Sequence, residues 1–235
     1  MAYARDEKTA KEVGDFVKVT SDMAFGLPYD KAAYSFDAKK KFGINVSSLL
    51  WDDNTRGRFG LSIDYKAFYR SLITYLIETG EYQVHIIPHV IDNKNYEAAE
   101  NDYRVCCELE KEFKGHVILA PAFETAIQAK SYISNMDVFL GSRMHSTIGA
   151  ISSGVATIPL SYAYKFEALY SHINYPYVIN ARKATTEEAL KMTKQWASER
   201  DKLKETGEIA VSHALDELVD FKNDLKISLK NNDIL

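Results

Sequence analysis

Short apolar runs alternate with longer amphipathic segments along most of this chain, and that alternation restricts the fold more than any other feature. Five apolar runs predict β-strands over residues 44–49, 83–88, 116–119, 137–140 and 157–160. Amphipathic segments predict helices over residues 62–79, 95–113, 123–133 and 145–153. The strands are apolar at nearly every position, as in a parallel sheet whose two faces are both covered. We therefore expect an α/β fold with an open, doubly wound and mostly parallel sheet, built from right-handed strand–helix–strand units.

The two ends of the chain depart from this pattern. The first residues resemble the end of a strand, a helix starts at about Asp6, and residues 16–20 are strand-like. Because a domain does not normally begin in the middle of a unit, we expect residues 1–40 to enter from an N-terminal domain that is missing here. Residues 41–183 then form the main domain, and residues 184–235 add helices that pack on it or cross back to another domain. The polar loop over residues 51–60 is either a mobile lid or an ordinary surface loop.

Composition excludes several classes of protein. Of the 235 residues, 46% are hydrophobic and 26% are charged, which is typical of a globular chain with a packed core and not of a disordered one. A net charge of -4 disfavours a nucleic-acid partner, although a few well-placed arginines are enough for a small anion. The two cysteines, Cys106 and Cys107, are adjacent and fit neither a disulfide nor a metal site. We find no signal-peptide pattern and no run near the roughly 20 apolar residues of a membrane span, so we expect a cytoplasmic protein without an integral membrane segment.

The strongest local signal is the stretch over residues 137–162, in which a buried strand is followed by a turn and a helix of small residues. Ser142 is a candidate N-cap, which places Arg143 and His145 in the first turn of that helix. Helix starts at the carboxyl edge of an open α/β sheet favour anions, and an arginine there adds a planar donor for carboxylate or phosphate. The alternative is that Arg143 pairs with a nearby acidic side chain and that His145 is a buried histidine whose hydrogen bonds are satisfied.

Other candidate residues occupy similar positions at strand ends. Arg5 follows the first strand-like residues, His89 follows the strand predicted over residues 83–88, and Lys165 follows the strand predicted over residues 157–160. His85 and His89 are four residues apart, but on a strand this distance is too long for one metal ion, so we expect no metal site. Glycine-rich dinucleotide, phosphate-loop and nucleophile-elbow motifs are absent from the sequence.

Three stretches of the sequence resemble the polysaccharide pyruvyl transferase family. The first is DVFLGSRMHSTIGAISSGVATIPLSYAYKF, whose core is the family pattern G-x-R-x-H-[ST]. The second is VHIIPHVIDN with the later triplet Asn101–Asp102–Tyr103, and the third is ARDEKTA. The resemblance covers roughly residues 4–182. It departs from the family at Ala156, where proline is usual.

The resemblance implies both a fold and an activity. The family fold is two Rossmann-like domains facing each other across a cleft, as in one class of glycosyltransferases, and this chain matches the second domain. The implied reaction transfers a carboxyethylidene group from phosphoenolpyruvate to two hydroxyls of a sugar of a surface or capsular polysaccharide precursor, which can be lipid-linked, and releases phosphate. Arg5 and Arg143 would hold the two anionic ends of the donor, and His145 would be the general acid. Ser142, Ser146, His89 and Lys165 would complete the substrate site, with no cofactor and no metal.

Two other readings stay open on the residues alone. A strand followed by Glu167 is also loosely typical of the donor-binding half of a nucleotide-sugar glycosyltransferase. The pair Arg143 and His145 favours a compact anion over a nucleotide. The third reading is a truncated, non-catalytic binding module.

Overall fold

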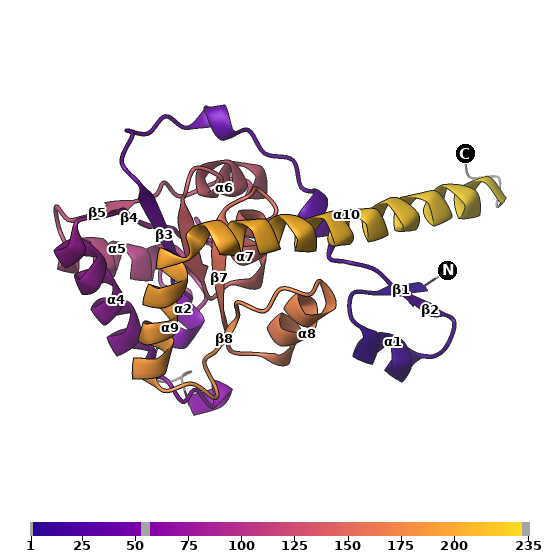
Figure 1. Cartoon of the computed structure of the whole chain (residues 1–235), viewed down its shortest axis with the longest axis horizontal. Coiled ribbons are helices and arrows are strands. Elements are labelled where there is room, and N and C mark those ends of the chain that lie inside the picture. The colour runs from indigo at the N-terminus through magenta and orange to yellow at the C-terminus, as the bar shows by residue number, and fades with distance from the viewer. Residues whose placement is uncertain (1, 53–56, 232–235) are drawn as a thin grey trace.

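A computed structural model describes residues 2–52 and 57–231 of the chain (Figure 1). It contains a six-stranded sheet in the order β5-β4-β3-β6-β7-β8, and every neighbouring pair of strands is parallel. The expected doubly wound α/β fold is therefore confirmed. The strands are β3 (Lys41–Asn45), β4 (Gln83–Ile86), β5 (Val117–Leu119), β6 (Val138–Gly141), β7 (Ala156–Ser161) and β8 (Ile179–Asn180).

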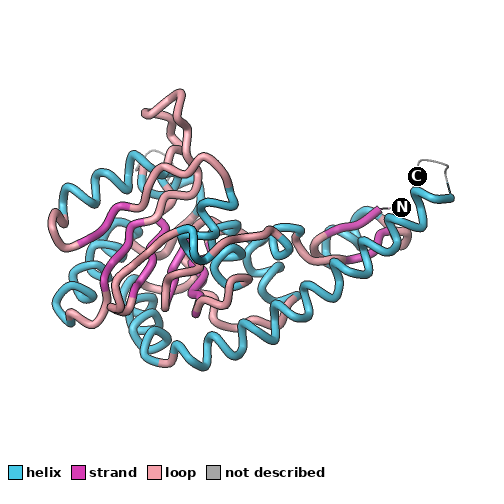
Figure 2. Tube along the Cα trace, turned by 90° about the horizontal axis from the view of Figure 1, so that it is seen from above, coloured by secondary structure: helices cyan, strands magenta, loops and turns pink. Residues whose placement is uncertain are grey.

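Helices cover both faces of this sheet, as Figure 2 shows from above. The helices after β3 are α2 (Ser48–Trp51), α4 (Tyr65–Thr79), α5 (Asp102–Glu112), α6 (Ala126–Ile133), α7 (Met144–Ile151), α8 (Tyr164–His172), α9 (Thr186–Ser198) and α10 (Arg200–Asn231). Successive side chains of β6 enter different cores: Val138 and Leu140 pack in the larger core with α4 and α5, whereas Phe139 packs in the smaller core against α6. All residues of β3, β6 and β7 are buried, which explains why these strands are mostly apolar, although β3 begins with Lys41 and ends with Asn45.

Two predicted boundaries are wrong, for local reasons. The strand predicted over residues 44–49 begins at Lys41 and ends at Asn45, and residues 48–51 form the short helix α2. The backbone N–H of Ser48 donates to the Asp102 carboxylate, which turns the chain out of the sheet. The helix predicted over residues 95–113 begins only at Asp102, where the side chain of Asn101 caps it.

The N-terminal residues form a small unit beside the sheet. Strands β1 (Ala2–Ala4) and β2 (Val17–Val19) are parallel, and α1 (Glu7–Val13) joins them with Asp6 as its N-cap. This matches the strand, helix and strand-like stretch predicted there. Two 3₁₀ helices, η1 (Met23–Gly26) and η2 (Lys31–Ala33), lead from this unit to β3.

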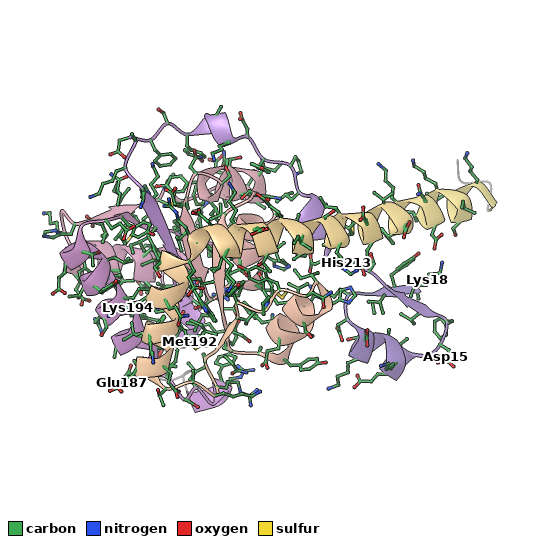
Figure 3. All side chains as sticks on the ribbon, in the orientation of Figure 1. Asp15, Lys18, Glu187, Met192, Lys194 and His213 are labelled. Atoms are coloured by element: carbon green, nitrogen blue, oxygen red, sulfur yellow. The ribbon has the colours of Figure 1, made fainter. Side chains whose placement is uncertain are left out.

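Helix α10 connects the sheet to this N-terminal unit. Its first half packs against the core through Leu203, Ala210 and Ala214, and its outer half extends along the unit (Figure 1). There Asp224 accepts hydrogen bonds from Tyr3 and Lys18, and Lys18 is labelled beneath the outer half of α10 in Figure 3. The C-terminal helices were expected either to pack on the main domain or to cross back to another domain. Helix α10 packs on the main core and also contacts the N-terminal residues.

Candidate active site

The carboxyl ends of β3 and β6 meet at Asn45, the last residue of β3. Its side chain is fully buried and accepts hydrogen bonds at Oδ1 from the backbone N–H of Arg143 and from the hydroxyl of Ser146, each at 3.0 Å. Its amide nitrogen donates to the carbonyl of Ile87, just after β4, at 3.0 Å. One amide therefore ties three strand ends together and fixes the start of α7.

Gly141 allows α7 to begin this close to the sheet. A Cβ atom at Gly141 would lie 2.8 Å from Cε1 of Phe139, 2.9 Å from Cγ2 of Thr147 and 3.0 Å from the hydroxyl oxygen of Ser146. These distances are too short for any side chain in the present arrangement. The glycine of the Gly-x-Arg-x-His pattern is therefore a packing requirement of the turn.

The predicted N-cap at Ser142 is wrong. The N-cap of α7 is Arg143, which has no side-chain capping bond. Ser142 is fully buried, and its hydroxyl lies 2.8 Å from the Tyr65 hydroxyl and 2.5 Å from the Tyr69 hydroxyl. The Ser142 hydroxyl therefore links the end of β6 to α4 through hydrogen bonds. The other predicted serine, Ser146, is also fully buried against Asn45.

Arg143 forms a buried ion pair with Asp102, the first residue of α5. Its Nη2 atom lies 2.8 Å from Oδ1 of Asp102, and its Nε atom lies 3.2 Å from each carboxylate oxygen. Asp102 also accepts from the backbone N–H groups of Ser48 and Val90. Burial opposes the charge of Arg143, but the paired carboxylate outweighs it and raises the pKa of Arg143. The structure thus shows the pairing that the sequence left as an alternative.

A second carboxylate, Asp22, brings Arg5 and His145 together. Oδ2 of Asp22 lies 2.7 Å from Nη1 of Arg5 and 3.6 Å from Nε2 of His145, and Oδ1 accepts from the backbone N–H of Ala24. Burial alone would raise the pKa of Asp22, but the contacts with His145, Ala24 and Arg5 outweigh it and hold this pKa well below its usual range. The His145 side chain is 54% exposed, so it is not the buried histidine considered above.

Asp22 was missed in the sequence, although a signal for it was present. It follows the strand-like residues 16–20, so it has the same strand-end placement that singled out Arg5. An acidic residue at such a position also explains how Arg5 and His145 can lie close together near a helix start.

Two cavities adjoin these residues. One, of about 400 Å³, is lined by Arg5, Lys8, Met144, Tyr164 and Lys165 among others. Lys165 is exposed and lies at the start of α8. The other cavity, of about 420 Å³, lies between η1, α6 and α7 and includes His89 and His145.

Two titratable residues of the second cavity are His89, which is half-buried, and Lys130, which is buried. Burial lowers the pKa of His89 to about 4, and its Nδ1 atom has no hydrogen-bond partner among the described residues. Lys130, which the sequence did not single out, donates to the carbonyl of Leu27 at 2.7 Å. Burial lowers the pKa of Lys130 to about 8.

Predictions from the sequence also concern metal ligands, membrane spans and the loop over residues 51–60. Within residues 2–52 and 57–231, no three histidine, cysteine or acidic side chains are grouped as metal ligands. In the same residues no helix has the length and apolar character needed to cross a membrane. The loop predicted over residues 51–60 lies partly outside the described residues.

Comparisons with known proteins identify a family and several folds to which this chain is similar. The sequence profile of polysaccharide pyruvyl transferases matches residues 1–164, and no curated protein matches the chain. The fold resembles α,α-trehalose 6-phosphate synthase from Burkholderia multivorans, with a TM-score of 0.52, 12% identity and coverage of 97% of this chain and 46% of that one. It also resembles UDP-GlcNAc 2-epimerase from Neisseria meningitidis bound to UDP-GlcNAc, with a TM-score of 0.54, 12% identity and coverage of 95% and 60%.

A third similar structure is WaaG, a glycosyltransferase involved in lipopolysaccharide biosynthesis, with a TM-score of 0.50, 12% identity and coverage of 90% and 57%. At these identities the likeness shows the fold alone. The chain spans about half the length of the solved structures that it resembles.

We predict that Asp102→Asn lowers the free energy of unfolding by about 3–5 kcal/mol, because it leaves the buried guanidinium of Arg143 without a counter-charge. Urea denaturation measures the change. The matched control is Glu112→Gln, which removes the carboxylate from the exposed pair of Arg70 and Glu112 and should cost less than about 1 kcal/mol. Equal losses in the two variants would contradict a structural role for the buried pair.

We also predict that the free energy of unfolding falls as the pH drops from about 6.5 to about 4. Burial lowers the pKa of His85, as it does that of His89, to about 4, whereas an unfolded histidine titrates near 6.5. Between these values the unfolded chain binds more protons, so acid favours unfolding. Asp22, whose pKa is lowered, adds acid sensitivity only below about pH 4.

Denaturation curves over this pH range test the effect. The double variant His85→Gln and His89→Gln should show a clearly shallower slope than the wild type between pH 6.5 and 4. An unchanged slope would show that these histidines do not cause it.

Proposed function

Since the chain belongs to the polysaccharide pyruvyl transferase family, we propose that it takes part in transferring a carboxyethylidene group from phosphoenolpyruvate to two hydroxyls of a sugar. The observation that carries the proposal is the meeting of Arg5 and His145 at Asp22, beside the start of α7. An anion-binding arginine and an exposed imidazole at the carboxyl edge of the sheet suit an enol phosphate. We place the reaction in the cytoplasm, as expected from the sequence.

The chemistry requires one proton donor and a site for a phosphate that leaves. Protonation of the donor methylene turns it into a methyl group and leaves an oxocarbenium carbon, which the first sugar hydroxyl attacks. The bond from that carbon to the phosphate oxygen then breaks and phosphate departs. The second hydroxyl attacks the same carbon, so that the two hydroxyl protons balance the proton on the methyl group and the proton carried away by phosphate.

Arg5 is suited to the anionic end of the donor. Its side chain is 48% exposed and lines the cavity that also holds Lys8 and Lys165. A phosphate dianion in this cavity would compete with Asp22 for the guanidinium through charge-assisted hydrogen bonds. The three cationic side chains outnumber the two carboxylates of this cavity, Asp6 and Glu12, and they offset the charge that develops on the leaving group without a metal.

Arg143 has a more indirect part in this proposal. Its side chain is only 10% exposed and is held by Asp102, so direct contact with the donor would require it to share its guanidinium. In its present place it is paired with Asp102 and helps to fix the start of α7. Ser142 and Ser146, which are both buried, support the same turn and hold Arg143 and His145 in place.

His145 is the proposed general acid. Its side chain is 54% exposed, and its Nε2 atom lies 3.6 Å from Oδ2 of Asp22. A bound phosphate dianion would favour the imidazolium form. Donor and proton are therefore expected to bind together, which prepares the ring to protonate the methylene carbon.

Binding of phosphoenolpyruvate tests the first step. We predict that phosphoenolpyruvate raises the melting temperature of the chain whereas UDP and GDP do not. Arg5→Ala should weaken binding roughly 10- to 150-fold, as expected for the loss of about 1.5–3 kcal/mol from a charged hydrogen bond. The matched control is Arg70→Ala. Arg70 lies on α4, is exposed to a similar extent and pairs with Glu112, so this variant should bind phosphoenolpyruvate normally. Stabilisation by UDP or GDP alone would instead favour the glycosyltransferase reading.

The general acid is tested by turnover in a form of the protein that catalyses transfer. We predict that His145→Gln lowers the single-turnover rate by about 10²- to 10⁴-fold, a typical contribution of general acid–base catalysis. Mass spectrometry of the carboxyethylidene product measures the rate. His116→Gln, which removes an exposed imidazole before β5, controls for the loss of a histidine. A stable His145→Gln protein with a near-normal rate would refute the assignment.

A further inference from the structure

The cavity between η1, α6 and α7 has no role in the reaction as described so far. Its volume is about 420 Å³, and its walls include Ala24, Leu27 and Ile133. His145 lines it as well, so the proposed general acid faces a largely apolar space. A water molecule takes up about 30 Å³ of liquid, so the cavity has room for a group much larger than a methyl.

Gly149 opens the part of this cavity nearest to His145. It follows His145 by four residues in α7, so the two positions lie on the same face of the helix, one turn apart. A Cβ atom at Gly149 would meet only the side chain of Lys130, at 3.7 Å from Cγ and 3.9 Å from Cβ. These are ordinary contact distances, so a side chain at residue 149 would occupy space that is now free.

The polar side chains that line the cavity are His89, Lys130 and His145, and the rest of the lining is apolar. The Lys130 amine donates to the carbonyls of Leu27 and Phe25 and is therefore directed at the backbone around η1. Asp22 faces the imidazole of His145 at Nε2. The space beside that ring thus suits a hydrocarbon group attached to the atom that the ring protonates.

We propose that this cavity receives the methylene end of the enol phosphate donor and that it admits donors whose methylene carries an alkyl group. The proposal rests on the proposed function, since it takes His145 as the acid that protonates this carbon. The added substrate class is C3-alkylated enol phosphates, such as the four-carbon homologue 2-phosphoenolbutyrate. Protonation then forms an ethyl group in place of methyl. The other bonds form and break as for phosphoenolpyruvate, and the product is a carboxypropylidene ketal with release of phosphate.

Calorimetric titration of the chain with both donors tests this. We expect the homologue to bind the wild type with the same affinity as phosphoenolpyruvate or up to about fourfold more tightly, as the burial of one more methyl group allows (about 0.8 kcal/mol). The informative quantity is the ratio of the two affinities. Gly149→Leu should shift this ratio at least tenfold against the homologue, and Gly149→Ala should shift it in the same direction by less.

The control variant is Ala168→Leu, which adds the same side chain in α8 at a polar cavity that includes neither His145 nor Gly149 and should leave the ratio unchanged. If Gly149→Leu does not fold, Gly149→Ala carries the test, because its Cβ atom fits at ordinary distances. If phosphoenolpyruvate binds but the homologue binds at least tenfold more weakly, the inference is overturned and the proposed function stands. An unchanged ratio in both Gly149 variants would also overturn it. If neither donor binds, the proposed function itself fails.

Discussion

The buried ion pair between Arg143 and Asp102 holds together the edge of the sheet on which the candidate site is built. A charge taken out of water is costly unless it is paired and hydrogen-bonded, and here both partners are satisfied. Asp102 receives the guanidinium together with backbone N–H groups from α2 and from the loop after β4. The start of α7, the start of α5 and the end of β3 are therefore held in one arrangement, and His145 acquires its position from it.

Because Arg143 is paired with Asp102 inside the protein, other side chains have to make the first contact with an anion in the proposed function. Arg5 and His145 share the carboxylate of Asp22 and keep exposed surface, so they are the groups that a ligand can reach without opening the core. In the proposed function, an incoming anion has to compete with Asp22 for the Arg5 guanidinium. Such competition favours a dianion over a monoanionic carboxylate. Only the stronger charge compensates for breaking the ion pair between Arg5 and Asp22.

The sheet could be predicted from the sequence because burial on both faces leaves a continuous apolar signal, as in β6 and β7. The boundaries that failed depend on hydrogen bonds between distant residues. Residues 48–51 leave the strand because Asp102 holds the backbone of Ser48. Ser142 does not cap α7 because its hydroxyl is taken up by Tyr65 and Tyr69. Local spacing carries no information about either partner.

The candidate site was predictable to the extent that strand ends collect functional side chains. Arg5 and His145 were identified in this way, and the structure brings them to one carboxylate. The partnership with Asp22 could not be read, because it depends on how the N-terminal unit packs beside the sheet. The same holds for Lys130, an ordinary helix residue in sequence, whose burial depends on contact with the backbone near η1.

Helix α10 gives the candidate site a mechanical property. Its 32 residues form a rod about 48 Å long at 1.5 Å per residue, anchored at one end in the main core and at the other beside Tyr3. Arg5 is carried by the N-terminal unit, whereas His145 is carried by α7 beside the sheet. Asp22 holds the two side chains together, and α10 braces the unit that carries Arg5 against the main core. The helix therefore supports, from outside the site, the relative placement of the two parts of the chain that supply it.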